Sequence, residues 1–295
     1  YSGDFSFQLY PIQLNVVHLY NLDPEFYKKL ATNPFMLNSY QDHFDLGLGA
    51  NLYYTTNSDV NPKTSYHYAR FSFGLAGNVL SVFKSAMKKD ENGAGMIWNT
   101  PYSQYVRSEI TLGKTWKFGK DDKLGFATRL LAGAGYAYGN SSVLPFEQHF
   151  YAGGANSLRG WQARSLGPGM AAMDTTFVIP NQTGDMKLEA NIEYRFDLFW
   201  KLEGAAFLDA GNVWTMKANK ANDPNSSSVF TWKNFGKSIA ANWGVGLRAD
   251  FNFLIVRVDW GMKLHDPSRE QSWLTPDQWV KRNGYAIHFG VGYPF

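Results

Sequence analysis

Hydrophobic and polar residues alternate over long stretches of this chain. In residues 184–196 every second position is apolar: Met186, Leu188, Ala190, Ile192, Tyr194 and Phe196. The positions between them are polar or charged: Lys187, Glu189, Asn191, Glu193 and Arg195. Successive side chains of a strand point to opposite faces, so this pattern predicts a β-strand with one apolar face and one polar face.

The same alternation recurs along the whole chain and predicts about ten strands, an even number as in bacterial outer-membrane barrels. The predicted strands are 5–20, 43–54, 67–79, 105–116, 123–137, 184–196, 201–214, 238–251, 252–263 and 285–295. The first of these is either one long strand or two shorter ones around Pro11. Helical signals are confined to residues 23–35 and 275–284, where a Pro follows a capping Asp or Thr; both predict short surface helices.

A membrane barrel explains these strands better than a soluble sandwich. Their length is close to the ~9–11 residues that a tilted strand needs to cross hydrocarbon. Aromatic residues cluster near strand ends, and full charges lie in the middle of the polar faces, where a wet lumen would solvate them. The connections alternate between long and short. We therefore predict an all-β, transmembrane, antiparallel up-and-down β-barrel, with Phe295 ending the last strand on the short-turn, periplasmic side.

Composition excludes several function classes. The chain of 295 residues has no cysteine, so disulfides and thiolate metal sites are excluded. Its net charge of +3 is small and scattered, which argues against a nucleic-acid partner. The 6 histidines show no ligand spacing, and no serine lies in a nucleophile elbow. We expect no enzymatic activity, no cofactor and no metal site.

The longest connection, residues 139–183, contains the glycine-rich stretch FYAGGANSLRGWQARSLGPG at 150–169. A phosphate-binding loop is disfavoured because the stretch lacks the G-x-G spacing and a following Lys-Ser/Thr. An ordinary surface loop leaves Arg159 and Trp161 unexplained. We predict instead that the loop folds back into the lumen. The residues at its centre are Gly153, Gly154, Leu158, Arg159, Gly160 and Trp161.

Small residues on the polar strand faces leave room for such a loop. Examples are Gly47, Gly49, Gly74, Ala76, Gly133, Gly135, Gly244, Gly246, Gly290 and Gly292. A guanidinium inside the lumen needs carboxylates, and Glu193 and Asp209 lie on the polar faces of the next two strands. We predict that both bind Arg159, while Gly160 permits a tight turn and Trp161 packs on the wall.

These residues carry a resemblance to a known family. GGANSLRGW resembles the Arg-Gly tip of the sixth loop in the superfamily of BamA, TamA and the two-partner-secretion transporters. AAFLDAGNVW, at 205–214, resembles its Phe-x-Asp-x-Gly strand through Phe207, Asp209 and Gly211. LEANIEYRF, at 188–196, resembles the preceding strand with its inward Glu. The opening portion is similar to members from Bacteroidetes-type bacteria.

The resemblance implies a barrel of sixteen strands preceded by periplasmic POTRA domains. About ten strands and no POTRA-like segment can be read in this sequence. We therefore expect residues 1–295 to be the C-terminal part of an outer-membrane barrel, with a lumen-inserting loop at 139–183. A self-contained barrel of ten strands is the alternative.

The resemblance also implies a function. In this family the first and last strands meet at a weak seam, and Gly290, Gly292 and Phe295 lie in the last strand here. The expected activity is the insertion of unfolded outer-membrane proteins by lateral opening and β-augmentation. Expected partners are these clients, membrane lipid and lipopolysaccharide, POTRA domains and accessory lipoproteins. A two-partner-type secretion pore and a passive porin are the alternatives.

Overall fold

The computed structural model describes residues 3–295 apart from 21–22, 32–36, 38, 60–61, 121–122, 173–181, 219–222, 224, 252 and 282. It is built on one antiparallel sheet of 10 strands, in which neighbours in sequence are neighbours in space. The strands are β1 (Asp4–Val17), β2 (His43–Thr55), β3 (Tyr66–Ala76), β7 (Tyr105–Phe118), β8 (Leu124–Ala137), β9 (Met186–Asp197), β10 (Leu202–Trp214), β11 (Ala240–Asp250), β12 (Ile255–His265) and β13 (Tyr285–Val291). The predicted order of strands is confirmed.

β1 is a single strand that passes through Pro11. Its pairing with β2 shifts register between Tyr10 and Gln13. Proline has no N–H to donate to the ladder, so the irregularity falls where the backbone cannot pair. Of the two interpretations left open for residues 5–20, the single strand is correct.

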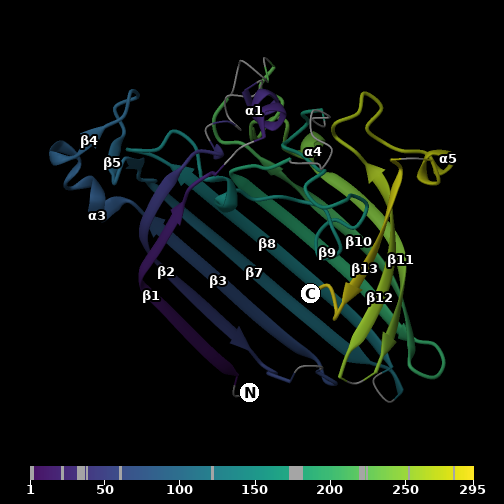
Figure 1. Cartoon of the computed structure of the whole chain (residues 1–295). Coiled ribbons are helices and arrows are strands. Elements are labelled where there is room, and N and C mark those ends of the chain that lie inside the picture. Colours follow the sequence, from purple (N-terminus) through teal and green to yellow (C-terminus); the bar gives the residue numbers. More distant parts are fainter. Residues whose placement is uncertain are drawn as a thin grey trace.

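Long and short connections alternate, as predicted. The long ones lie at one end of the sheet, the long-loop end, and the short ones at the other, the short-turn end (Figure 1). The long connections carry the helices α1 (Pro24–Ala31), α3 (Asn78–Ser81), α4 (Phe235–Ser238) and α5 (Pro276–Trp279), with short 3-10 turns η1 (Lys84–Ala86) and η3 (Phe146–Gln148). Sequence periodicity missed a small sheet of β4 (Lys88–Lys89), β5 (Gly95–Ile97) and β6 (Thr100–Pro101), whose strands are too short to show alternation. No described helix is both long enough and apolar enough to span a bilayer.

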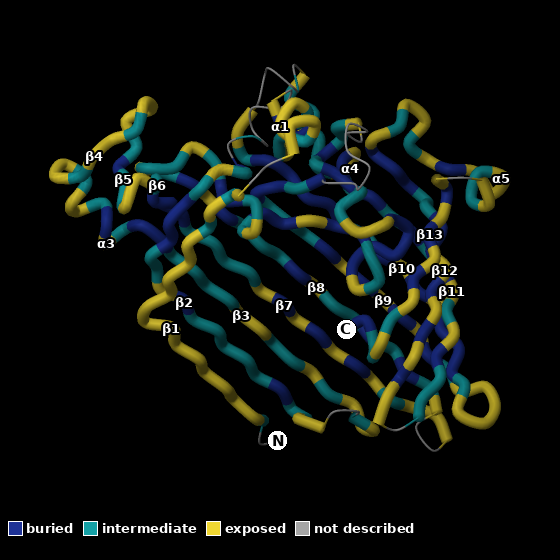
Figure 2. Tube along the Cα trace, in the orientation of Figure 1, coloured by how far each residue is buried: buried dark blue, intermediate teal, exposed yellow. Residues whose placement is uncertain are grey.

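The sheet curves into a wall, and we call its concave face the lumen face (Figure 1). β1 and β13 form its two edges, and no pairing between them occurs among the described residues. β1 is exposed along nearly its whole length (Figure 2). Both edges therefore present backbone groups that are available to another strand.

Apolar side chains cover the convex face of the wall. Leu208 on β10 is 43% exposed, whereas its neighbours Phe207 and Asp209 on the lumen face are 5% and 0% exposed. A soluble protein would bury the apolar set instead. This arrangement, apolar outside and polar inside, is the one expected of strands surrounded by lipid.

The lumen at the long-loop end is filled by the connection between β8 and β9. Its described residues form a buried apolar cluster with the wall: Phe150, Ala152, Leu158, Trp161, Leu166, Val213 and Ala240. The charges on the neighbouring lumen faces are largely covered by this loop. Our expectation that water solvates them is wrong for β9 to β12, because the charges are paired with one another instead.

The C-terminus departs from the prediction. β13 ends at Val291, and Gly292 has a φ of 78°, a left-handed conformation that glycine adopts without strain. Pro294 then removes a backbone donor. Tyr293 and Phe295 consequently turn away from the sheet, so Phe295 neither ends a strand nor joins an aromatic girdle.

Cationic side chains explain where this terminal segment goes. The guanidinium of Arg195 lies 4.0 Å from the ring centre of Tyr293, whose hydroxyl donates to Glu203 at 3.1 Å. The ring of Phe295 faces Arg129 at 5.2 Å. Aromatic faces attract guanidinium groups, so the lumen offers these rings partners that the lipid side lacks.

We expect Leu208→Arg to destabilise the folded chain in a bilayer by about 2–4 kcal/mol, the cost of a cation on the lipid face near the midplane. Unfolding by denaturant in phospholipid vesicles measures this difference. Leu208→Val is the matched control and should change the free energy of unfolding by less than about 1.5 kcal/mol. Equal stability of the Arg and Val variants would show that this face does not contact hydrocarbon.

Candidate functional site

The glycine-rich loop owes its shape to residues before its tip. Gly153 and Gly154 have φ values of 92° and 102°, which side chains with a Cβ rarely adopt. A Cβ on Gly153 would also collide with the carbonyl oxygen of Gln162. The N–H of Gly154 donates to the carbonyl of Trp161 at 2.8 Å. The chain therefore turns back on itself between these glycines and Trp161; residues 173–181 of the loop lie outside the described residues.

The tip is a tight turn with an apolar side and a charged side. The N–H of Trp161 donates to the carbonyl of Leu158 at 3.2 Å, which closes the turn around Arg159 and Gly160. Leu158 and Trp161 are buried in the apolar cluster with Val213. With these two side chains packed on the wall, Arg159 is directed toward β9, β10 and β11.

A glycine in the tip and a glycine in the wall let the two backbones come into contact. A Cβ on Gly160 would lie 2.7 Å from Cβ of Asn242 on β11. A Cβ on Gly261 of β12 would collide with the carbonyl oxygen of Arg159. Any side chain at either position would push loop and wall apart, so the close approach requires glycine.

Arg159 is fully buried and bound by two carboxylates. Its Nε and Nη2 donate to the two oxygens of Asp209 at 3.0 and 2.9 Å, and its backbone N–H also donates to Asp209, at 3.1 Å. Nη1 forms an ion pair with Glu193, and Phe207 lies 3.5 Å beneath the guanidinium carbon. Burial alone would lower the pKa of Arg159, but Asp209 and then Glu193 outweigh it and raise the pKa. We call this arrangement the arginine lock.

The strand register completes the coordination of Asp209. Asn191 on β9 and Asn242 on β11 lie directly opposite Asp209 in the two ladders. Their amide nitrogens donate to its carboxylate at 2.9 and 3.0 Å. Both oxygens of Asp209 are thus occupied by donors, and a carboxylate held by so many hydrogen bonds is strongly oriented.

Further arginines extend the lock along the wall. Glu193 also accepts from Arg195 at 2.7 Å and from Arg248 at 2.9 Å. Arg248 reaches Asp259 at 2.8 Å, and Asp259 pairs with Arg257. Sequence alternation put these residues on the lumen face, but it could not pair them, because pairing depends on the register between strands.

A second set of contacts holds the chain just before the tip. Arg129 donates to the carbonyl of Asn156 at 2.8 Å, and Arg257 donates to the carbonyl of Ala155 at 3.0 Å. Asn191 donates to the carbonyl of Ser157 at 3.0 Å. The loop is therefore bound through its backbone as well as through Arg159, from strands on both sides of β10.

The remaining predicted site residues lie around the lock. Gly211 follows Asp209 by two residues, and a Cβ there would collide with the carbonyl oxygen of Leu188. A Cβ on Gly290 of β13 would lie 2.7 Å from the Arg257 guanidinium, and Phe295 lies 5.9 Å from that of Arg159. Gly292 makes the turn that ends β13. The roles of all these residues in function stay predictions.

The geometry of the arginine lock is suited to holding the loop in place rather than to catalysis. Both oxygens of Asp209 accept from the guanidinium, whose third nitrogen pairs with Glu193, and all three side chains are shielded from solvent. Such a site fixes the position of the loop relative to four strands.

Removing the guanidinium should destabilise the fold. Arg159→Ala leaves Asp209 buried without its cation, which costs about 3–5 kcal/mol, whereas Glu193 keeps Arg195 and Arg248. Arg159→Lys should cost less, because it keeps the charge but loses the planar fork. Denaturant unfolding in vesicles measures both. Arg70→Lys is the control, because Arg70 lies on the lumen face against Tyr53, outside the lock. Equal losses at positions 159 and 70 would contradict the lock.

Comparisons with known proteins identify the family of this chain. The Omp85 superfamily domain matches residues 9–295. The outer membrane protein assembly factor BamA of Neisseria meningitidis serogroup B is 27% identical over 214 residues, which are 64% of this chain and only 26% of that protein. Solved structures that resemble the chain, each with 15% identity, include BamA from Haemophilus ducreyi lacking POTRA domains 1–3 (TM-score 0.43, covering 86% of this chain and 55% of that one) and CdiB from Acinetobacter baumannii (TM-score 0.47, covering 84% and 33%). Because the family match spans nearly its whole length, this chain belongs to the Omp85 superfamily and is a bacterial outer-membrane β-barrel protein.

Proposed function

We propose that this chain is the barrel portion of a factor that inserts other outer-membrane proteins into the membrane. The similar Neisseria protein is named an outer membrane protein assembly factor. The observation that carries the proposal is the edge strand β13. It pairs with β12 over the short span Tyr285–Val291, and no second strand pairs with it among the described residues. An edge strand is a template for another strand.

In the proposed mechanism a client strand adds to the free edge of β13. Main-chain hydrogen bonds form with the client, which then leaves sideways into the bilayer. No covalent bond is broken, so the mechanism needs neither a catalytic group nor a cofactor. The inward turn at Gly292 supports this mechanism, because it keeps residues 292–295 from extending the edge.

The arginine lock has a defined part in this mechanism. It ties the loop to Glu193 on β9 and Asp209 on β10, and Asn242 of β11 binds Asp209 in turn. Arg257 of β12 also holds the loop backbone, and all four strands precede the edge strand. While β13 exchanges partners, the wall behind it has to keep its register. A buried ion pair with a fixed fork is well suited to this task, since its geometry tolerates little displacement.

The wider setting is part of the proposal. We infer that the 10 strands of the wall are the C-terminal strands of a sixteen-stranded barrel, with POTRA domains elsewhere in the protein. The exposed edge of β1 supports this inference, because it too lacks a second neighbour among the described residues. Unfolded outer-membrane proteins, accessory lipoproteins, lipid and lipopolysaccharide are the proposed partners.

Two alternatives share this fold. A passive porin needs an open lumen, whereas here the β8–β9 loop fills the long-loop end with a buried apolar cluster. A two-partner-type secretion pore would pass its substrate through the lumen, which requires the loop to leave the lock. The assembly factor requires no such release, and its client meets the chain at the edge instead.

Photo-crosslinking distinguishes these functions. A photoreactive phenylalanine analogue replaces Phe289, which is 78% exposed on β13, in cells that are synthesising outer-membrane proteins. We expect adducts with unfolded client proteins at this position. The matched control is Val245, an outward residue of β11 away from the edge. A third probe replaces Arg70 on the lumen face.

Adducts with a secreted protein at position 70, and none at position 289, would favour the secretion pore and contradict the proposal. Adducts of equal yield at positions 289 and 245 would show nonspecific contact and remove its support. Cells that depend on the Arg159→Ala variant should also assemble fewer client barrels than cells with Arg70→Lys.

A further inference from the structure

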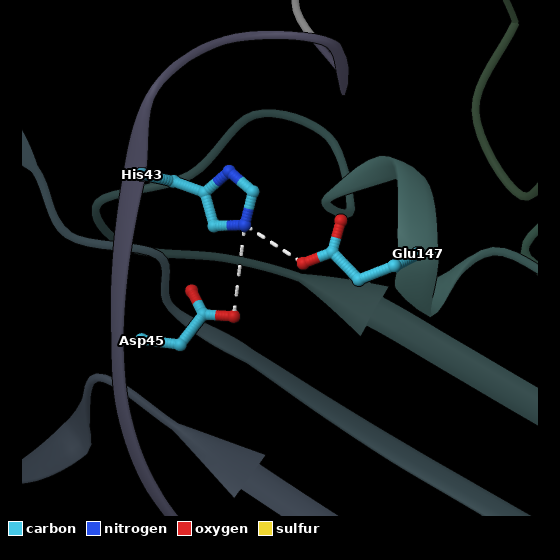
Figure 3. A group of neighbouring side chains, drawn as sticks. All are labelled: His43, Asp45 and Glu147. Carbon is cyan, nitrogen blue, oxygen red and sulfur yellow. Dashed lines mark hydrogen bonds and ion pairs between the residues drawn. The ribbon is translucent and has the colours of Figure 1, made fainter. Parts of the chain in front are cut away.

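A second charged cluster lies at the long-loop end of the wall, away from the arginine lock. His43 and Asp45 begin β2, and Glu147 lies on η3 in the β8–β9 loop (Figure 3). Nε2 of His43 is 2.7 Å from Oε1 of Glu147 and 3.8 Å from Oδ2 of Asp45. One atom from each residue lies within 4.8 Å of the others. Sequence spacing could not reveal this cluster, because Glu147 comes from a distant segment.

The environment of His43 determines which of its nitrogens can bind a metal. Nδ1 is 2.9 Å from the carbonyl oxygen of Gln41, a group that only accepts, so Nδ1 carries a proton and donates it. Nε2 is hydrogen-bonded to Glu147, so it carries a proton in the metal-free chain, and a metal that displaces this proton meets a lone pair facing Asp45 and Glu147. Three electron-pair donors therefore converge on one point. Metal-binding histidines have the same arrangement, with the second ring nitrogen donating to a backbone carbonyl.

Asp45 gives an independent indication that the cluster can hold a cation. The residue is 4% exposed, and its Oδ1 is buried without a hydrogen-bond partner among the described residues. Oδ2 accepts a long hydrogen bond of 3.4 Å from the hydroxyl of Tyr105, and Ser103 also interacts with the carboxylate. A buried carboxylate oxygen that binds nothing is costly, so the site has unused capacity to bind a positive charge.

An ion can reach the cluster from solvent. The side chain of Glu147 is 37% exposed. A cavity of about 540 Å³ at the long-loop end is lined in part by His43, Gln41 and Ser103. The cavity supplies an entry path and room for water as a further ligand.

We propose that His43, Asp45 and Glu147 bind a divalent transition-metal ion, for which Zn²⁺ is the probe. One imidazole nitrogen and two carboxylate oxygens form a ligand set that suits zinc, with water in the open position. Ligand distances of ~2.0–2.2 Å require Glu147 to move slightly away from His43, and its partial exposure permits this. The bound ion ties β2 to the base of the loop whose tip is locked on β9 to β12.

The test measures metal bound by the purified, folded full-length protein after treatment with a chelator. Zn²⁺ is titrated in detergent micelles, with bound metal quantified by elemental analysis and the thermal unfolding midpoint recorded in parallel. We expect about one Zn²⁺ per chain, bound by three protein ligands, and a midpoint that rises with Zn²⁺. Glu147→Gln should weaken binding by at least about tenfold and abolish the rise.

His18→Asn is the matched control. His18 forms a pair with Asp42, so this variant removes a nearby histidine and carboxylate contact that lies outside the cluster. We expect it to bind Zn²⁺ like the unaltered chain. Asp45→Asn is a second variant, with far-UV circular dichroism as a check that the sheet has formed.

Three outcomes would overturn the proposal. One is the absence of stoichiometric Zn²⁺ binding, in which case His43 is simply a protonated partner of the carboxylates and Glu147→Gln lowers stability with no effect of metal. Another is Zn²⁺ binding that survives Glu147→Gln. The third is tighter binding of Ca²⁺ or Mg²⁺ than of Zn²⁺, which would be inconsistent with an imidazole ligand.

Discussion

The fork between Arg159 and Asp209 is the interaction on which the inner architecture depends. A wall that is apolar toward lipid has to place its charges on the lumen face, and the loop then buries them. Replacing a buried ion pair by apolar residues is often neutral or stabilising, so the pair is weak evidence for stability. Its specificity is the stronger argument. The observed placement of the tip satisfies Asp209, Glu193 and the apolar contacts of Trp161 together.

Strand register is what makes this placement possible. Asn191, Asp209 and Asn242 form a row across three strands. The two asparagine amides donate hydrogen bonds to the Asp209 carboxylate, which also binds the guanidinium of Arg159. A slip of one residue in either ladder would turn a member of the row toward lipid. The glycines at 160 and 261 add a second requirement, since backbone contact between tip and wall leaves no space for a side chain.

The alternation of apolar and polar residues predicts the strands and their lumen faces, but it does not predict which residues pair across strands. Alternation located the ten strands, and the spacing of Glu193 and Asp209 on polar faces indicated where an inserted arginine would find acids. The arginine and asparagine partners required the register, which no local pattern encodes. The turn at Gly292 was missed because a glycine two residues before a proline is equally consistent with the end of a strand. The metal-binding cluster joins segments that are distant in sequence.

The strands of the wall are held less firmly toward its C-terminal edge. β9 and β10 have strand neighbours on both sides and carry the lock, whereas β13 pairs with β12 alone over a short span. Local opening is cheapest where buried contacts are fewest, so β13 can separate before β10 loses a hydrogen bond. In the proposed function this difference is necessary. A wall of uniform stability would open too rarely or lose register when it opened, whereas a locked wall beside a weakly held edge can exchange partners repeatedly.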